Sequence, residues 1–120
     1  LRARRRAGGV VWFDFSALCG GPRSQNDYLE LATQFHTVLL SDVPQMPPRL
    51  ASEARRFTWL GDVLYDRRVK LIMSAAVPPE QLYTEGPMAH EFPRTVSRLV
   101  EMQSAEFLAL ERREVDTRLT

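Results

Sequence analysis

The sequence predicts an α/β fold, in which mostly parallel strands alternate with helices along a chain of 120 residues. The clearest support lies in residues 54–75, where apolar residues first recur at steps of three and four. That spacing places them on one face of a helix. A short apolar run follows, which is typical of a strand buried on both faces of a parallel sheet. The same alternation of strand and helix patterns continues on both sides of this stretch, as in β-α-β units.

Each predicted element follows from the local pattern of residues. Short apolar runs predict three strands, near residues 10–15, 37–41 and 69–74. Apolar periodicity predicts three helices, near residues 25–35, 49–66 and 93–112. Ser24 and Asp27 have the spacing of a capping box at the start of the first helix. Pro93 suits the first turn of the last helix, because the missing amide hydrogen would have no partner there in any case.

The composition limits the classes to which the chain can belong. A hydrophobic fraction of 44% is enough for one folded domain or part of one. No apolar run approaches the roughly 20 residues of a membrane helix, and no secretory signal pattern is present. The single cysteine, Cys19, excludes an internal disulfide framework and fits a reducing compartment. Because His36 and His90 are the only histidines, no metal site of ordinary spacing is expected.

The two ends of the chain carry no predicted element. Arginines occupy four of the first six positions, and we interpret residues 1–9 as a solvated basic connector. The alternative is an arm that binds nucleic acid or an acidic partner. No stripe of Lys and Arg with interleaved aromatics follows, so nucleic acid is not the expected partner.

Residues 114–120 are expected to form a tail. Because the chain starts with Leu rather than Met, we expect it to be the C-terminal piece of a longer protein.

The sharpest candidate for chemistry is a pair of arginines on the last predicted helix. Arg94 and Arg98 lie four residues apart, which brings them to one helical face. Like charges at that spacing repel, and a shared anion, either a phosphate or a neighbouring carboxylate, would relieve the repulsion. The alternative is an exposed pair that Glu101 partly neutralises. The sequence does not decide between these two interpretations.

Polar residues at the ends of two predicted strands form a second set of candidates. Ligands of parallel sheets gather at the carboxyl ends of the strands, which is why these positions matter. Asp42 could hold Mg²⁺ or a catalytic water there, but a role in the turn before Pro44 is the favoured interpretation. Ser74 could bond to a phosphate or a water, and a bond to nearby backbone is an equal alternative.

The central helix carries weaker candidates. Arg55, Trp59 and Asp62 fall on its polar stripe, and Arg56 adjoins them. A solvated helix face explains most charges of this kind. Trp59 is either a contact residue or, more commonly for such a position, a half-buried packing residue.

Four phrases of the sequence resemble the ZapE/Afg-type family of AAA+-related P-loop ATPases. They are WFDFSALCGGPRSQNDYLELA at 12–32, FHTVLLSDVP at 35–44, ARRFTWLGDVLYDRRVKLIMSA at 54–75 and EFPRTVSRLVEMQSAEFLALERR at 91–113. They cover nearly the whole chain, and they are most similar to the C-terminal third of the bacterial branch. Gly61 departs from the family pattern, which has an apolar residue there. A glycine within a helix costs about 1 kcal/mol relative to alanine.

The resemblance implies a three-layer fold like that of P-loop NTPases and an ATPase that holds ATP and Mg²⁺ mainly through upstream residues. The 120 residues contain no G-x-x-x-x-G-K-[ST] loop, so alone they are not expected to hydrolyse ATP. The resemblance also implies a bacterial cytoplasmic protein that acts on the FtsZ division ring. Arg94, Arg98 and Ser74 would then be phosphate-sensing or interface residues. Self-association is left open, and the alternative function is a non-catalytic docking module for a division or membrane-protein client.

Overall fold

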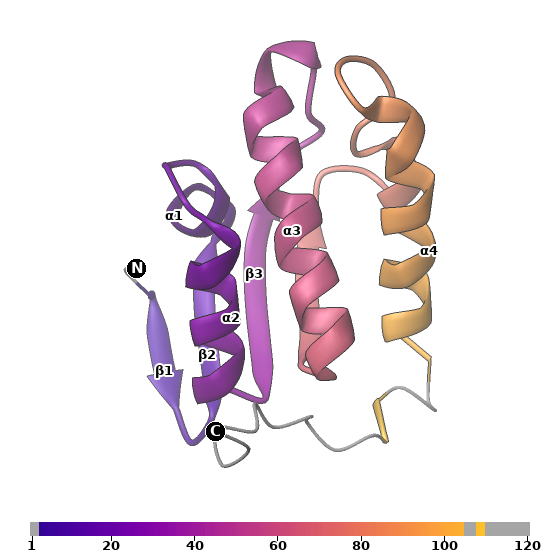
Figure 1. Cartoon of the computed structure of the whole chain (residues 1–120). Coiled ribbons are helices and arrows are strands. Elements are labelled where there is room, and N and C mark those ends of the chain that lie inside the picture. The colour runs from indigo at the N-terminus through magenta and orange to yellow at the C-terminus, as the bar shows by residue number, and fades with distance from the viewer. Residues whose placement is uncertain (1–2, 105–107, 110–120) are drawn as a thin grey trace.

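The computed structural model describes residues 3–104 and 108–109, and it confirms the mixed α/β fold (Figure 1). The described strands form one sheet in the order β1-β2-β3-β4, with bounds Arg5–Ala7, Val10–Asp14, Thr37–Val43 and Lys70–Ala75. The α-helices of the described chain are α1 (Phe15–Cys19), α2 (Gln25–Gln34), α3 (Ala51–Arg67) and α4 (Phe92–Met102). Single 3₁₀ turns lie at Pro48–Leu50, Pro79–Gln81 and Ala89–Glu91.

The three predicted strands are confirmed, and they pair in parallel as expected. β2 pairs with β3, and β3 pairs with β4. The register aligns Trp12 with Leu39 and Leu39 with Ile72, so these three side chains form a row across the sheet. The carboxyl ends of the three strands consequently meet at one edge of the sheet, where the candidate residues Asp42 and Ser74 lie.

The N-terminal residues differ from the prediction, because part of the expected connector is a strand. Arg5–Ala7 form β1, which pairs antiparallel with β2. The turn between the two strands needs glycine: Gly8 and Gly9 have φ angles of 55° and 86°. A Cβ atom at Gly9 would also lie 2.6 Å from the His36 ring. Three exposed residues give no apolar periodicity, so the sequence pattern could not indicate this strand.

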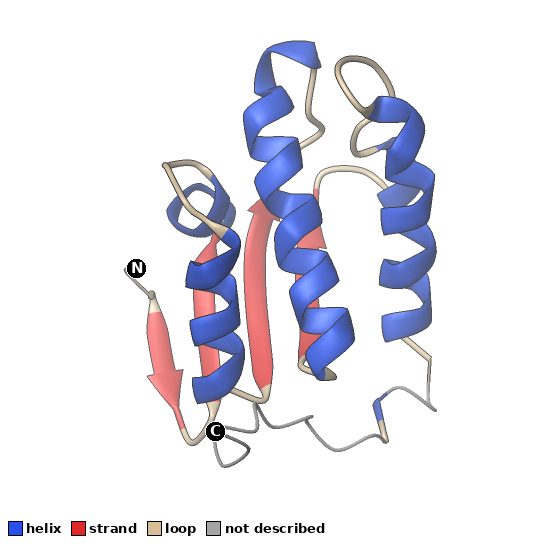
Figure 2. Ribbon diagram, viewed as in Figure 1, coloured by secondary structure: helices blue, strands red, loops and turns tan. Residues whose placement is uncertain are grey.

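The helices α2, α3 and α4 lie side by side over one face of the sheet (Figure 2). Alternate strand residues such as Val11, Val38 and Leu71 point into this layer and are at most 2% exposed. The prediction that the strand at 69–74 is buried on both faces is wrong, since Ile72 is 56% exposed. The reason is that the described residues supply helices to one face only, so the opposite side chains meet no second layer.

Helix boundaries agree with the prediction at the start of α2 and differ at the end of α4. The capping box is confirmed: the Ser24 amide donates to Asp27 Oδ2 at 2.8 Å, and the Ser24 side chain caps the N3 amide in return.

The sequence pattern predicts that the last helix reaches residue 112, but α4 ends at Met102 and a turn follows. Residues 105–107 and 110–112 of the predicted helix lie outside the described residues, as does the tail expected at 114–120. Phe15, placed in a strand by the sequence pattern, begins α1 instead.

Gly61 lies inside α3 at a position that has room for a side chain. Its neighbour is Thr95 of α4, whose Cγ2 would be 3.9 Å from an added Cβ, an ordinary van der Waals contact. Because glycine loses more backbone freedom on folding than alanine, Gly61→Ala should raise the free energy of unfolding by about 1 kcal/mol. Urea unfolding measures this. Gly86→Ala is the contrast: φ at Gly86 is +124°, a Cβ there would meet the Tyr83 hydroxyl at 2.7 Å, and stability should fall. Equal effects of the two substitutions would contradict the expectation.

Candidate functional site

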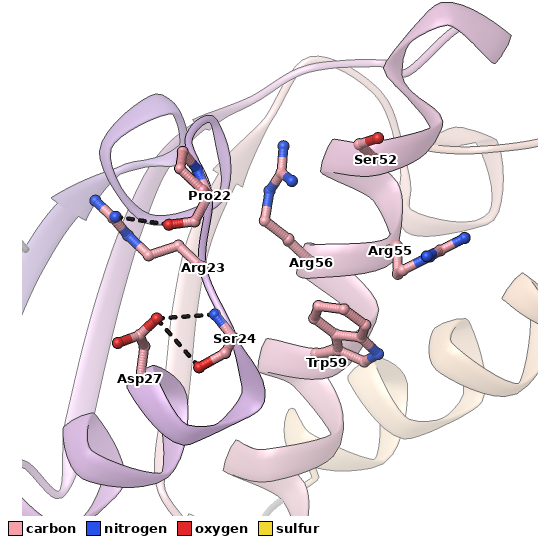
Figure 3. A pocket seen from close by; sticks show the side chains of 8 residues that line it. All are labelled: Pro22, Arg23, Ser24, Asp27, Ser52, Arg55, Arg56 and Trp59. Carbon is pink, nitrogen blue, oxygen red and sulfur yellow. Dashed lines mark hydrogen bonds between the residues drawn. The ribbon is translucent and has the colours of Figure 1, made fainter.

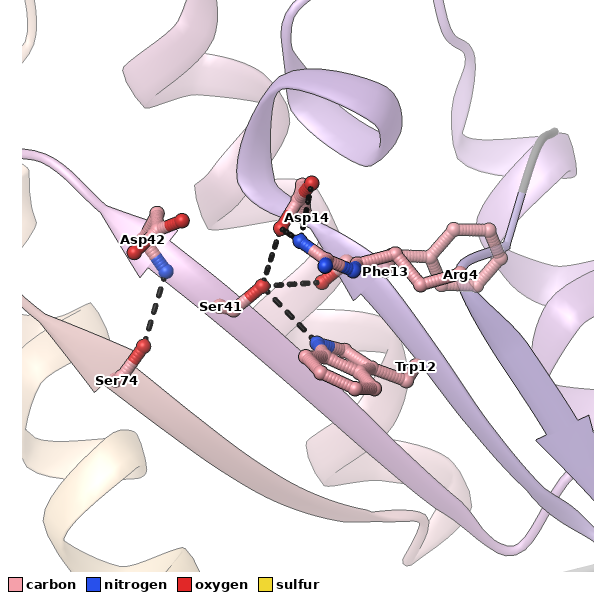
Figure 4. Close-up of polar contacts among 7 residues, drawn as sticks. All are labelled: Arg4, Trp12, Phe13, Asp14, Ser41, Asp42 and Ser74. Atoms are coloured by element: carbon pink, nitrogen blue, oxygen red, sulfur yellow. Dashed lines mark hydrogen bonds and ion pairs between the residues drawn. The ribbon is translucent and has the colours of Figure 1, made fainter.

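A polar network joins the ends of β2 and β3 (Figure 4). Arg4 Nη1 donates to both carboxylate oxygens of Asp14, each at 3.1 Å. The Ser41 hydroxyl donates to Asp14 Oδ1 and accepts a hydrogen bond of 3.0 Å from the Trp12 indole. The Arg4 guanidinium also covers the Trp12 ring, with 4.6 Å between its Cζ and the ring centroid. Both oxygens of Asp14 therefore accept hydrogen bonds within the chain, and the Arg4 guanidinium already balances the charge of the carboxylate.

The network favours the ionised form of Asp14. The hydrogen bond from Ser41, followed by the one from Arg4, lowers the pKa of the Asp14 carboxyl below its ordinary value of 3.8. Sequence reasoning missed this cluster. Its signal is the one acidic residue in the otherwise apolar run at 10–15, together with a serine at the end of the next strand.

The lowered pKa of Asp14 gives stability a specific dependence on pH. The folded-state pKa lies below the unfolded value, so this group stabilises the fold above about pH 4 and the contribution is lost as pH falls through the folded pKa. Between about pH 6 and pH 3 the urea midpoint of the wild type should fall further than that of Asp14→Asn. Asp66→Asn removes an exposed charge from α3 and is the control. If Asp14→Asn and the wild type lost stability in parallel, the network would carry no such dependence.

Ser74 and Asp42 meet at the ends of β3 and β4 (Figure 4). The Asp42 backbone amide donates to Ser74 Oγ at 3.0 Å, so Ser74 bonds to the backbone of the neighbouring strand. Asp42 has a φ angle of 61° within an irregular stretch of pairing between Leu40 and Val43, and its side chain is exposed. Roles of these two residues in binding a phosphate or Mg²⁺ stay predictions.

The structure separates the roles of Arg94 and Arg98, which the sequence treats as a pair. Arg98 Nη1 lies 2.7 Å from Asp62 Oδ1 of α3, and its Cζ lies 4.9 Å from the centre of the Tyr65 ring. A neighbouring carboxylate thus serves as the anion for Arg98. Glu101 instead accepts a 2.6 Å hydrogen bond from the Tyr65 hydroxyl, which raises the pKa of Tyr65. Arg94 is exposed, and among the described residues it has no ion-pair partner.

A cavity of about 500 Å³ lies between the start of α2 and the first half of α3 (Figure 3). Its lining is Pro22, Arg23, Ser24, Asp27, Ser52, Arg55, Arg56 and Trp59. The weaker candidates Arg55 and Arg56 therefore come together here with Trp59. Asp62, the other weaker candidate of α3, does not join them, because it pairs with Arg98.

Two of the three arginines that line this cavity donate hydrogen bonds to backbone carbonyls of α1. Arg56 Nε donates to the Cys19 carbonyl at 2.7 Å, and Arg23 Nη2 donates to the Ala17 carbonyl at 3.1 Å. Carbonyls in the last turn of a helix have no partner within it, so the arginines complete that short helix. Burial raises the pKa of the Cys19 thiol to about 12, which leaves it unreactive. Arg55 differs, since it is exposed and makes no ion pair within the described chain.

The described residues offer neither a metal centre nor a membrane-spanning helix. No three His, Cys, Asp or Glu side chains cluster closely enough to hold a metal ion in the part of the chain that the structure describes. None of the helices in that part is both long enough and apolar enough to cross a membrane.

The fold and its arginine-rich surfaces define a mixed α/β segment without a phosphate-binding loop of its own. The sequence model of the AFG1-like ATPases matches residues 1–111. The chain belongs to the AFG1-like ATPase family. It is 50% identical over 97 residues to the Cell division protein ZapE of Escherichia coli, covering 81% of this chain and 26% of that protein.

More distant relatives are eukaryotic. The chain is 40% identical over 83 residues to an uncharacterised protein of Schizosaccharomyces pombe, which covers 69% of this chain and 18% of that protein. It is 32% identical over 135 aligned positions to Lactation elevated protein 1 homolog B of Danio rerio, covering 86% of this chain and 27% of that protein. The chain thus spans about a quarter or less of the length of these curated relatives. No solved structure matches it.

Proposed function

We propose that these residues form the C-terminal part of a bacterial cytoplasmic ATPase that hydrolyses ATP to act on the FtsZ division ring. The observation that carries the proposal is the 50% identity to Cell division protein ZapE over 97 residues, within the AFG1-like ATPase family. The FtsZ ring is proposed as the client because the family resemblance implies it. The proposed three-layer arrangement would also explain the side of the sheet that the described helices leave open, because a second layer from the remainder of the protein would cover Ile72, which is 56% exposed, and the partly buried Trp12 and Leu39 in the same row.

ATP and Mg²⁺ would be held mainly by residues outside this segment. The sequence contains no Walker-type loop, and Asp14 already uses both carboxylate oxygens within the chain. Asp42 would be one carboxylate ligand at most, and Mg²⁺ at a nucleotide also needs the phosphates, which a Walker-type loop would hold. The described residues do not fit a complete nucleotide site, and we derive no catalytic step from them.

Of the two arginines of α4, Arg94 is the one that we propose contacts a phosphate or a neighbouring subunit. It lies exposed in the first turn of α4, whereas Arg98 of the same helix is tied to Asp62 at 2.7 Å. A guanidinium that has no internal partner keeps all of its donors for an external anion. If the protein self-associates, the nucleotide of another copy is one such anion.

The test uses the complete gene product that contains these residues. Arg94→Ala should lower the kcat of ATP hydrolysis about tenfold or more, with the stability of the protein unchanged. Arg94→Lys should restore part of the activity, and Arg5→Ala, at an exposed arginine of β1, is the matched control. A purified wild-type protein that does not hydrolyse ATP, with or without FtsZ filaments, would overturn the ATPase proposal. Full activity of Arg94→Ala would remove only this residue from it.

The docking module remains the second candidate function. It is favoured by a groove of about 460 Å³ beside α3, mostly apolar in its lining, which no described segment fills. If these 120 residues alone pull down FtsZ in the absence of nucleotide, the docking function is supported. If FtsZ is pulled down only by the complete protein in the presence of ATP, the ATPase function is favoured.

A further inference from the structure

A groove of about 460 Å³ lies between α3 and the segment that leads into α4. Its floor consists of buried side chains that are each at most 4% exposed, those of Ala54, Tyr83 and Phe92. Ala54 is small, and this leaves room that a larger residue of α3 would occupy. Met88 stands at the rim, 51% exposed on a residue with a φ angle of 64°. A flexible thioether at an open apolar groove adapts to partners of differing shape.

Trp59 and Arg55 give the groove the side chains that dominate protein interfaces. Both residues line this groove as well as the arginine-rich cavity on the α2 side, so they form the ridge between the two. Figure 3 shows Arg55 directed away from Arg56 and toward α4. Tryptophan and arginine are among the residue types most enriched in interface hot spots. The ridge therefore combines an aromatic surface with a cation that has no ion-pair partner among the described residues.

The charges around the groove are unequal on its two walls. The α3 wall carries Arg55, whereas the opposite wall carries Glu91. Arg56 does not line the groove, and it pairs with Glu53 at 3.6 Å. Arg55 and Glu91 do not pair with each other in the described chain. A ligand that lies along the groove would gain from a carboxylate against the α3 wall, and the apolar floor would take a neighbouring side chain.

From this complementarity we propose that the groove binds a peptide segment of a protein client, one that carries a bulky apolar side chain next to a carboxylate. This inference rests on the proposed function only in taking the ligand to be a client protein. The apolar side chain enters between Ala54, Tyr83 and Phe92, and Met88 closes over it. The carboxylate pairs with Arg55, which sets the direction of the peptide in the groove.

The experiment measures binding of a short fluorescein-labelled peptide to the complete protein, by anisotropy and without nucleotide. The probe has a central Phe-Leu pair preceded by two aspartates. Replacing the aspartates with asparagines, or the Phe-Leu pair with serines, should each weaken binding about tenfold. Arg55→Glu should weaken binding by a similar factor, whereas Arg67→Glu, the same change at the far end of α3, should leave it unchanged. Met88→Ser tests the apolar rim independently of charge and should also weaken binding.

Each outcome bears on the proposal. Equal binding by Arg55→Glu and the wild type, or equal losses with Arg55→Glu and Arg67→Glu, would overturn it. A protein that ignores the peptide but changes from dimer to monomer with Arg55→Glu in sedimentation would assign the groove to a second copy of the chain instead. A wild-type protein that binds the peptide but does not hydrolyse ATP would overturn the proposed function and not this inference, because peptide binding is measured without ATP.

Discussion

Phe57→Ala is expected to lower the free energy of unfolding by about 3–5 kcal/mol. Phe57 lies in α3 and is fully buried. Its ring centroid is 6.1 Å from that of Phe15 in α1 and 6.3 Å from that of Phe92 in α4. Truncation removes the buried ring and leaves a cavity where three helices meet, and both changes cost stability. Domains of this size are stable by only about 5–15 kcal/mol, so the variant should be near unfolding at 37 °C.

The control for Phe57 is an apolar residue that makes no such contacts. Val100 of α4 is 58% exposed, and Val100→Ala should change stability by less than about 0.5 kcal/mol. Urea unfolding followed by circular dichroism gives both values, with the slope of the transition as a check on two-state behaviour. A loss below about 1 kcal/mol for Phe57→Ala would show that the three helices do not pack as the structure has them.

The central unit of the fold was predictable because its signals are local and repeated. α3 carries apolar residues at helical spacing over several turns, and the run after it is apolar long enough to indicate a strand. The capping box at Ser24 and Asp27 is a pattern of four residues that defines a helix start without tertiary information. Parallel pairing then follows from the alternation of strands and helices.

The features that were missed depend on which residues meet in space. β1 has only three exposed residues, and its pairing with β2 is set by the turn at Gly8 and Gly9. An apolar run does not reveal whether one or two faces of a strand are covered. For this reason the sequence pattern predicts Ile72 to be buried, whereas the structure exposes it. The polar network at the ends of β2 and β3 joins Asp14 to Ser41, which lies 27 positions further along the chain, and no short pattern records such a contact.

The paired arginines show the same limit for the candidate site. Helical spacing correctly places Arg94 and Arg98 on one helix, but it says nothing about the helix packed against them. Asp62 of α3 forms an ion pair with Arg98, whereas Arg94 is exposed. The distinction between the two residues is therefore a tertiary one, and it changes which of them is worth testing for a role in ATP hydrolysis.

Arg98→Ala should lower the free energy of unfolding by about 1.5–2 kcal/mol, because it removes a charged hydrogen bond that holds α4 against α3. The guanidinium and the Asp62 carboxylate are 2.7 Å apart, and their side chains are 23% and 30% exposed, so water screens the pair only in part. The variant also loses the contact between Arg98 and the Tyr65 ring. Arg98→Lys keeps the charge without the planar stacking group and should recover part of the loss.

A double-mutant cycle with Asp62→Asn separates this internal role from a role at a nucleotide. If Arg98 acts through Asp62, the two substitutions should be non-additive by at least about 0.5 kcal/mol, because the second removes a partner that the first has already isolated. Any loss of ATPase activity in the complete protein should then follow the loss of stability and be shared by Asp62→Asn. An Arg98→Ala protein of unchanged stability that has lost its activity would reverse the assignment, since only a contact outside the described chain could produce that combination.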